Sequence, residues 1–229
     1  MREVNKAYIW TLDRNLTSIV VRALSLINVK YEIPYRVDCN DIREPGILIV
    51  EDKLLGSVSG ACSVGGTEGA EVVVVRPNQP IFSALSVIAA YMKLHEAVLG
   101  LDTSPERPAY ALLADGMAIN AGYIEWGALG GIIRELCSSL RAFDMTGSIG
   151  VGYSSWIERD TLLDRLRSIL NGVYCEGKLS IYLVDEHRSN SEPLYGIHGT
   201  DLLESEDISA AAIVALRTRS RRSRLVMAL

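Results

Sequence analysis

Asp102 is the carboxylate with the clearest chemical interest, because it ends the apolar run 97–101. A carboxylate at the end of a buried strand costs free energy unless a partner or a bound ion offsets that cost. A divalent cation is one such partner, since Mg²⁺ prefers oxygen ligands. Two later acidic pairs have similar settings: Asp185–Glu186 follows the apolar run 179–184, and Glu206–Asp207 precedes the apolar run 208–216.

The elements that must position these acids alternate between strands and helices. Apolar runs predict three consecutive strands around Asp102, at 97–102, 109–113 and 117–126. Asp115–Gly116 lies between the last two runs and is a strong hairpin signal. Helical spacing follows from Gly127. The remaining predicted elements are a helix at 127–143, a strand at 148–153, a helix at 158–170, a strand at 179–184 and a closing helix at 208–216.

Three segments carry family-like motifs in the same order. Residues 99–112 are similar to the pattern LGLDxGxxRxGxAL, residues 184–190 to VDERxTS, and residues 207–215 to DxxAAAxIL. These patterns are typical of ribonuclease H-like nucleases. The chain most resembles the Holliday-junction-resolvase-like branch of that superfamily, the YqgF and RuvC types. The resemblance implies a ribonuclease H-like mixed sheet with an antiparallel three-strand start and helices on both faces.

The same resemblance implies a site and a reaction. Asp102, Glu186 and Asp207 would be the catalytic residues and would bind Mg²⁺ or Mn²⁺. Strand alternation lets only one member of the pair Asp185–Glu186 point into the site, and the family pattern favours Glu186. Metal ions held by carboxylates activate water and stabilise the leaving oxygen in phosphodiester hydrolysis. The expected substrate is structured DNA or RNA, and a homodimer is expected because resolvases of this group often act as dimers.

Each acid also has a plainer interpretation. Asp102 fits a strand-end acid that faces water, and Asp185–Glu186 fits a solvated acidic pair. Acids in a first helical turn, such as Asp207, are favoured by the helix macrodipole alone. His187 stands where the family usually has arginine, and a surface histidine is the simpler interpretation.

The net charge and the local distribution of charge give opposite indications about nucleic-acid binding. The net charge is -5 and the sequence pI about 5.3, which is unlike a dedicated nucleic-acid binder. A local basic patch can still bind phosphates. The candidates for such contacts are Arg188, Arg219, Arg221 and Arg222. A solvated C-terminal tail is the alternative for the last three.

Departures from the family pattern support other functions. Ser104 and Ala109 stand where the family has glycines, and Pro105 and Pro108 lie between them. The loop is therefore stiffer and bulkier, which favours a catalytically inactive binding module for nucleic acid or protein on the same fold. A phosphotransfer enzyme of the actin and sugar-kinase type shares the first-strand aspartate and hairpin. It needs two such domains, and the N-terminal half lacks that opening.

Residues 1–95 predict a small α/β domain of unknown role, followed by the ribonuclease H-like domain at 96–229. The predicted strands are 7–13, 30–33, 46–50 and a central strand at 71–76. The predicted helices are 16–29, capped by Asn15, and 81–96, capped by Asn78. The glycine-rich stretch 56–69 lacks the spacing of a phosphate-binding motif, so a mobile surface loop is expected.

The totals suit a globular protein of one large or two small domains, with 229 residues and 48% hydrophobic content. No uncharged apolar run is long enough for a membrane span, and the first residues lack a signal-peptide core. We therefore expect a cytoplasmic protein without a membrane partner. The four cysteines, Cys39, Cys62, Cys137 and Cys175, lie far apart in sequence and are expected to be free thiols.

Overall fold

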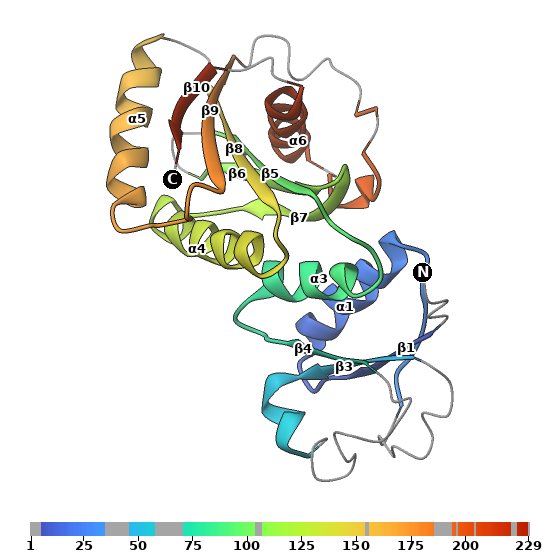
Figure 1. Cartoon of the computed structure of the whole chain (residues 1–229). Helices are drawn as coiled ribbons and strands as arrows, with labels where there is room; N and C mark the ends of the chain where they lie inside the picture. Colours follow the sequence, from blue (N-terminus) through green and yellow to red (C-terminus); the bar gives the residue numbers. More distant parts are fainter. Residues whose placement is uncertain are drawn as a thin grey trace. The chain divides into compact units, whose positions relative to one another are not determined.

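The computed structural model of the chain is an α/β protein with two compact units, Met1–Lys93 and Leu94–Leu229. Figure 1 shows the elements of each unit. The structure describes residues 6–34, 46–57, 71–103, 107–153, 156–185, 194–195, 197–203, 205–220 and 224–228. The glycine-rich stretch 56–69 lies almost wholly outside these ranges, as do Cys39 and Cys62.

The N-terminal unit contains a parallel sheet with the strand order β2-β1-β3-β4. Its strands are β1 (Lys6–Trp10), β2 (Lys30–Glu32), β3 (Ile47–Glu51) and β4 (Glu71–Val75). Helices α1 (Arg14–Leu26) and α3 (Pro80–Ala89) pack against each other on one face of the sheet (Figure 1), and a short 3-10 turn, η1 (Asp52–Leu54), follows β3. Leu16, Val20, Ala23 and Leu24 form the buried stripe of α1, as an amphipathic helix requires.

Four details of this unit differ from the sequence prediction, and one of them is the N-cap of α3, which is Gln79 and not Asn78. Asp13, not Asn15, caps α1, because its Oδ1 accepts the Leu16 N–H at 2.8 Å. Helix α3 ends at Ala89 rather than near residue 96. Strand β4 lies at an edge of the described sheet, not at its centre, and its Val72 is exposed. A run of β-branched residues fits edge and central strands alike, so the run did not identify the position of β4.

The C-terminal unit contains a six-stranded mixed sheet with the order β10-β9-β8-β5-β6-β7. Its strands are β5 (Glu96–Asp102), β6 (Ala109–Ala114), β7 (Met117–Tyr123), β8 (Thr146–Tyr153), β9 (Leu179–Asp185) and β10 (Arg224–Ala228). Strands β5, β6 and β7 are antiparallel neighbours, whereas β8 runs parallel to β5 and β9 parallel to β8. The antiparallel three-strand start and the mixed sheet were both predicted.

Helices cover both faces of this sheet. They are α4 (Trp126–Ala142), α5 (Trp156–Leu170) and α6 (Glu206–Arg219), with a 3-10 turn, η3 (Thr200–Leu202), before α6. Gly150 faces α6, because a Cβ there would lie 2.0 Å from Thr218 Oγ1, whereas a Cβ at Gly147 would meet Leu140 of α4 at 2.4 Å. Positions three apart on a strand point to opposite faces. Helix α6 therefore packs on one face and α4 on the other, as Figure 1 shows.

The predicted hairpin between β6 and β7 is confirmed at Asp115–Gly116. Both residues have positive φ, 47° for Asp115 and 87° for Gly116, as a tight two-residue hairpin turn requires. The Asp115 carboxylate also accepts the backbone N–H groups of His95 and Glu96, each at 3.1 Å. One turn residue thus fixes the hairpin and the beginning of β5 together.

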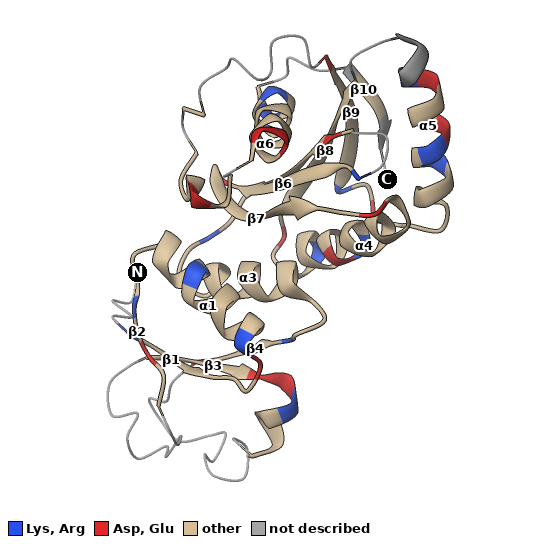
Figure 2. Cartoon of the chain, turned by 180° about the vertical axis from the view of Figure 1, so that it is seen from behind, with Lys and Arg blue, Asp and Glu red and all other residues tan. Residues whose placement is uncertain are grey.

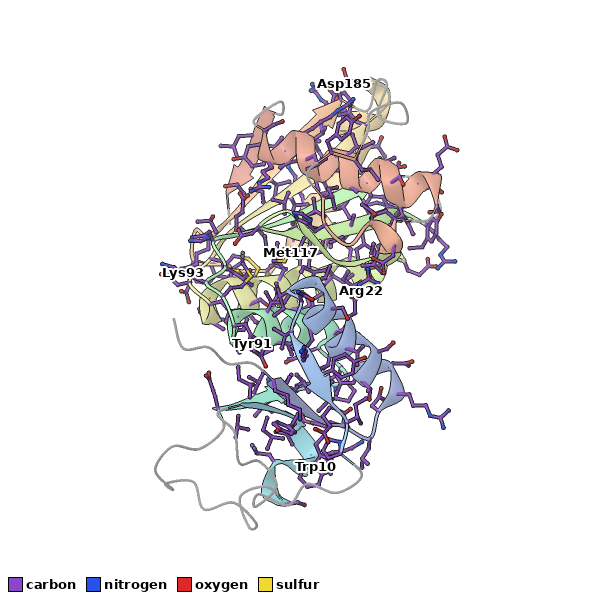
Figure 3. All side chains as sticks on the ribbon, turned by 90° about the vertical axis from the view of Figure 1, so that its right-hand side faces the viewer. Trp10, Arg22, Tyr91, Lys93, Met117 and Asp185 are labelled. Carbon is purple, nitrogen blue, oxygen red and sulfur yellow. A yellow bond between two sulfur atoms is a disulfide. The ribbon has the colours of Figure 1, made fainter. Side chains whose placement is uncertain are left out.

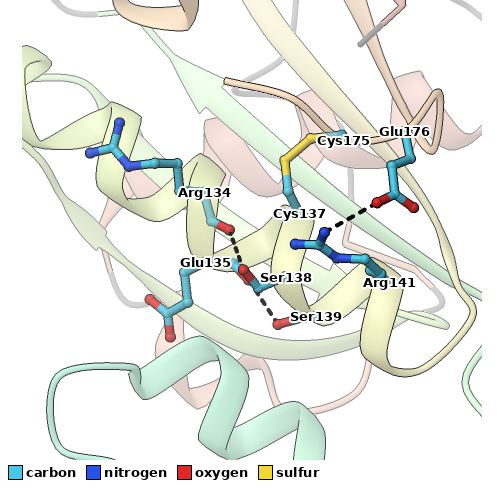
Figure 4. Close-up of a disulfide and its surroundings, with 8 residues drawn as sticks. All are labelled: Arg134, Glu135, Cys137, Ser138, Ser139, Arg141, Cys175 and Glu176. Carbon is cyan, nitrogen blue, oxygen red and sulfur yellow. Dashed lines mark hydrogen bonds and ion pairs between the residues drawn. A yellow bond between two sulfur atoms is a disulfide. The ribbon is translucent and has the colours of Figure 1, made fainter. Parts of the chain in front are cut away.

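Cys137 and Cys175 form a disulfide, so the expectation of free thiols was wrong for these two residues. Cys137 lies on α4 and Cys175 in the turn before β9, 38 residues apart in sequence and 5.1 Å apart between Cα atoms. Figure 4 shows the bond beside the ion pair of Arg141 and Glu176, which measures 3.1 Å. The wide spacing of the cysteines along the chain argued against a zinc motif, but it gave no information on how close they lie in the folded unit.

A further strand, which the sequence did not predict, lies near the C-terminus. Residues 224–228 form β10, which pairs antiparallel with β9 and adds a strand to the sheet. Across the described parts of the chain, no helix combines the length and the hydropathy that a membrane crossing needs.

Candidate functional site

Asp102 ends β5 at the carboxyl edge of the sheet and is half-buried. Gly100 faces α6, because a Cβ there would lie 1.9 Å from the Ala211 carbonyl oxygen. Strand alternation then assigns Asp102 to the same face. The next residue, Thr103, donates its hydroxyl to the Gly152 carbonyl at 2.8 Å and ties the end of β5 to β8.

Asp185 lies at the end of β9, in register with Tyr153 of β8. Gly152 and Val184 are the preceding registered pair, and they lie on the α6 face, because Gly150, two residues earlier on β8, faces α6. Alternation therefore assigns Asp185 to the opposite face, and its side chain is exposed. Figure 3 labels Asp185 at one end of the unit and Met117, where β7 begins, toward the other. The predicted ligand Glu186 and the neighbouring Arg188 lie outside the described residues.

A buried arginine holds the end of β9. Arg217 on α6 is 9% exposed, and its guanidinium donates to the backbone carbonyl of Asp185. A guanidinium stays charged at all relevant pH values, so burying it is costly without hydrogen-bond acceptors. Arg217 therefore places a positive charge beneath the strand end that leads to Glu186.

Asp207 lies in the first turn of α6, directly after the N-cap region. Ser205 is the N-cap and accepts the Ile208 N–H at 3.2 Å. The Tyr123 hydroxyl lies 3.0 Å from Asp207 Oδ2. Acidic residues open α6 and basic residues close it (Figure 2), which is the arrangement that the helix macrodipole favours.

Strand register relates Asp102 to Asp207. Asp102 pairs with Ala109 of β6, and Ala109 pairs with Tyr123 of β7, so the three residues form one row at the carboxyl edge. Two strand spacings separate the ends of that row, or roughly 10 Å between Cα atoms. Asp207 contacts the Tyr123 end. Asp102 and the Tyr123 contact of Asp207 thus lie at the same edge and on the α6 face, two strands apart.

Three carboxylates do not converge within the part of the chain that the structure describes. No group of three or more His, Cys, Asp or Glu side chains there is arranged to hold a metal ion. Of the three predicted ligands, Asp102 and Asp207 lie within the described residues and Glu186 lies outside them.

The predicted basic residues are distributed differently from the acids. Arg219 forms an ion pair with Glu96, which begins β5, so it lies at the opposite edge of the sheet from Asp102. Arg221 and Arg222 lie outside the described residues. Helix α6 accordingly runs from the carboxyl edge, at Asp207, to the amino edge, at Arg219.

Tyr123 was not singled out by sequence reasoning. Counting back from the Asp115–Gly116 turn places Gly122 opposite Ala109. A β-bulge in β7 shifts the register by one residue and brings Tyr123 opposite Ala109 instead. Because a one-residue shift exchanges the two faces of a strand, the turn signal alone would place Tyr123 on the wrong face.

The N-terminal unit has a buried carboxylate of its own. Glu51 ends β3 with its side chain fully buried, and its Oε2 accepts the N–H groups of Leu12 at 2.7 Å and Asp13 at 3.1 Å. Its Oε1 pairs with Lys53 Nζ at 2.6 Å. Burial raises the pKa of Glu51, but the hydrogen bonds from Lys53, Leu12 and Asp13 outweigh burial and hold the pKa below its usual value. Glu51 is therefore an ionised latch between β3 and the loop after β1.

Comparison with known proteins adds no family assignment: no protein-family model and no curated protein matches this chain.

Proposed function

We propose that the C-terminal unit is a ribonuclease H-like domain and that the chain is a metal-dependent nuclease acting on structured nucleic acid, of the Holliday-junction-resolvase-like kind. Its catalytic carboxylates are Asp102, Glu186 and Asp207. The proposal includes a homodimer, because a two-fold assembly suits a symmetric branched substrate. It also includes a cytoplasmic location.

The order of the strands supports the fold part of this proposal. Three antiparallel strands, β7, β6 and β5, are followed across the sheet by β8 and β9, both parallel to β5. Helices cover both faces, and the last of them, α6, packs on β5, β6 and β8. This is the arrangement that the motif resemblance implies.

The observation that carries the functional part is the placement of Asp102 relative to α6. Asp102 ends a strand in the middle of the sheet and belongs to the face that α6 covers. Helix α6 begins at the same edge with Asp207, which contacts the row of Asp102 through Tyr123. Buried strands thereby present two acids from distant parts of the chain at one edge.

The donor chemistry fits a hard divalent cation. Asp102 and Asp207 offer carboxylate oxygens, which Mg²⁺ and Mn²⁺ accept as ligands. Such a cation, when bound, supplies Lewis acidity and lowers the pKa of water. The protein's own contribution is to hold the two carboxylates on rigid elements, β5 through its strand pairing and α6 through close packing on Gly100 and Gly150.

Cleavage assays test this function directly. The wild-type chain is incubated with a four-way DNA junction and with a linear duplex, in Mn²⁺ and in EDTA. We expect Mn²⁺-dependent cleavage of the junction, and its loss in Asp102→Asn. Asp164→Asn is the matched control, because Asp164 is an exposed acid on α5 paired with Arg167. Equal cleavage by wild type and Asp102→Asn contradicts the assignment.

A binding module on the same fold is the second candidate. Ala109 stands where the family has glycine, and it is fully buried between Asp102 and Tyr123 in the register. Its methyl group prevents the close backbone approach that glycine allows. Junction binding that is equal in Mn²⁺ and EDTA, with no cleavage in either, identifies this function.

A further inference from the structure

The Tyr123 hydroxyl joins the carboxyl edge of the sheet to the first turn of α6. Its oxygen lies 3.0 Å from Asp207 Oδ2 and 3.1 Å from Ser205 Oγ. These contacts connect residues more than 80 positions apart in the sequence. They are made at the end of β7, in the row that begins with Asp102.

The direction of the hydrogen bonds follows from the groups themselves. A carboxylate only accepts, so the single phenol proton is donated to Asp207. The Ser205 oxygen accepts the Ile208 N–H at 3.2 Å, and its own hydroxyl proton can be donated to Tyr123. The carboxylate of Asp207 is therefore held through one of its oxygens, and its remaining lone pairs can still accept.

The tyrosine ring is itself held in place. The Arg107 guanidinium lies over the ring, 5.8 Å from its centroid, and Arg107 Nε pairs with Glu125 Oε1 at 3.3 Å. Such a cation–π contact restricts the ring without occupying its hydroxyl. The ring that carries the hydroxyl is thus contacted by Arg107 while the hydroxyl itself contacts α6.

Capping does not require this contact. Ser205 already caps α6, and an acid at Asp207 is stabilised by the helix N-terminus without any partner. What Tyr123 adds is a fixed orientation of the Asp207 carboxylate. Residues that orient metal-binding carboxylates through hydrogen bonds change metal affinity about 10- to 100-fold when they are removed.

We propose that Tyr123 is a positioning residue that orients Asp207 for cation binding at the carboxyl edge of the sheet. This inference rests on the proposed function, since it needs Asp207 to bind a cation. It assigns to the hairpin strand β7 a direct part in building the site, in addition to β5, β9 and α6.

The test is a Mn²⁺ titration of the full chain, followed by the electron paramagnetic resonance signal of free Mn²⁺. Wild type, Tyr123→Phe, Asp102→Asn and Asp207→Asn are compared. Tyr174→Phe is the control, because Tyr174 is 75% exposed and lies between α5 and β9, outside the strands that form the row. We expect Tyr123→Phe to weaken Mn²⁺ binding about tenfold. Its unfolding midpoint in EDTA should match that of the control.

The outcomes separate the two claims. If Asp102→Asn and Asp207→Asn lose Mn²⁺ binding while Tyr123→Phe binds as tightly as wild type, the positioning role is wrong and the metal site stands. The free energy of unfolding of Tyr123→Phe in EDTA is also compared with its free energy of Mn²⁺ binding. If both fall by the same amount relative to wild type, the role of Tyr123 is structural only. If wild type binds no Mn²⁺, the proposed function fails and the positioning role with it.

Discussion

Gly100 of β5 and Ala211 of α6 pack backbone against backbone. A Cβ at Gly100 would lie 1.9 Å from the Ala211 carbonyl oxygen and 2.7 Å from the Ala215 amide nitrogen. Ala211 is one of three consecutive alanines on α6, and their small side chains allow this close approach to the sheet. The approach keeps the helix that carries Asp207 at a fixed distance from the strand that carries Asp102.

Gly100→Ala therefore destabilises the C-terminal unit. Neither backbone atom can move without shifting α6, so we expect a loss of at least about 2 kcal/mol in the free energy of unfolding. Urea denaturation followed by circular dichroism measures it. Gly131→Ala on α4 is the matched control, because a Cβ there meets nothing within 4 Å. That control should stabilise by about 0.5–1 kcal/mol, as alanine is the better helix former. Equal stability of the two variants contradicts the packing account.

Glu51→Gln tests the latch in the N-terminal unit. The amide keeps the shape and one acceptor but removes the charge that pairs with Lys53, so we expect a loss of about 1–2 kcal/mol at pH 7. Hydrogen exchange of the Leu12 and Asp13 amides should quicken in the variant. Glu32→Gln, which breaks the exposed pair with Lys6, is the control and should leave both amides unchanged.

The pH dependence of this latch has a definite sign. The pKa of Glu51 is lowered from its usual value of 4.5 in the folded chain, so the unfolded chain takes up the proton first. The stability contributed by Glu51 is fully present above that value and is lost as pH falls through the lower folded pKa. The difference between wild type and Glu51→Gln should shrink over that acid range. A difference that stays constant down to the acid transition would show that Glu51 is not ionised in the fold.

Reduction of the Cys137–Cys175 disulfide should lower stability. A cross-link across 38 residues lowers the conformational entropy of the unfolded chain. In the chain-entropy treatment this raises the free energy of the unfolded state by about 4 kcal/mol. The measurement is the unfolding midpoint with and without dithiothreitol in a Cys39→Ser/Cys62→Ser background, together with a thiol count. The Cys137→Ser/Cys175→Ser variant should not respond to the reductant. An unchanged midpoint in the first background, or two free thiols before reduction, argues against the bond.

Arg217→Met should destabilise the C-terminal unit by about 2 kcal/mol, because it removes a buried charged donor from the backbone carbonyl of Asp185 while keeping most of the side-chain volume. Hydrogen exchange at the end of β9 should quicken in the same variant. Arg167→Met provides the control, since Arg167 is exposed on α5 and pairs with Asp164 in its own helix turn. Similar effects of the two substitutions would remove the special role of Arg217.

Local signals in the sequence predicted the elements around Asp102 well. Asp115–Gly116 fixed the hairpin because few residues accept two successive positive φ values. Helical spacing located α4 and α5, and an apolar run after acidic residues located α6. These signals act over a few residues, so they can be interpreted without knowledge of the tertiary fold. The α/β class followed from the order of these elements along the chain, whereas the mixed sheet was implied by the resemblance to ribonuclease H-like proteins.

Features that depend on the tertiary fold were not predicted. The bulge that brings Tyr123 into the row of Asp102 is a register choice made by packing, and the Cys137–Cys175 contact joins segments that only the fold brings together. Strand β10 follows an arginine-rich stretch with no strand pattern of its own, and it forms by pairing with β9. The candidate site was therefore predicted residue by residue, whereas its supporting contacts came from the structure.

The central claim is a metal site built on Asp102, and the most direct measurement is thermal unfolding with and without Mn²⁺ for wild type and Asp102→Asn. A ligand that binds only the folded state stabilises it by about 2.7 kcal/mol at 100 times its dissociation constant. The account predicts a clear rise in the wild-type midpoint that Asp102→Asn does not show. An identical response of the two proteins, or no response in either, would contradict it.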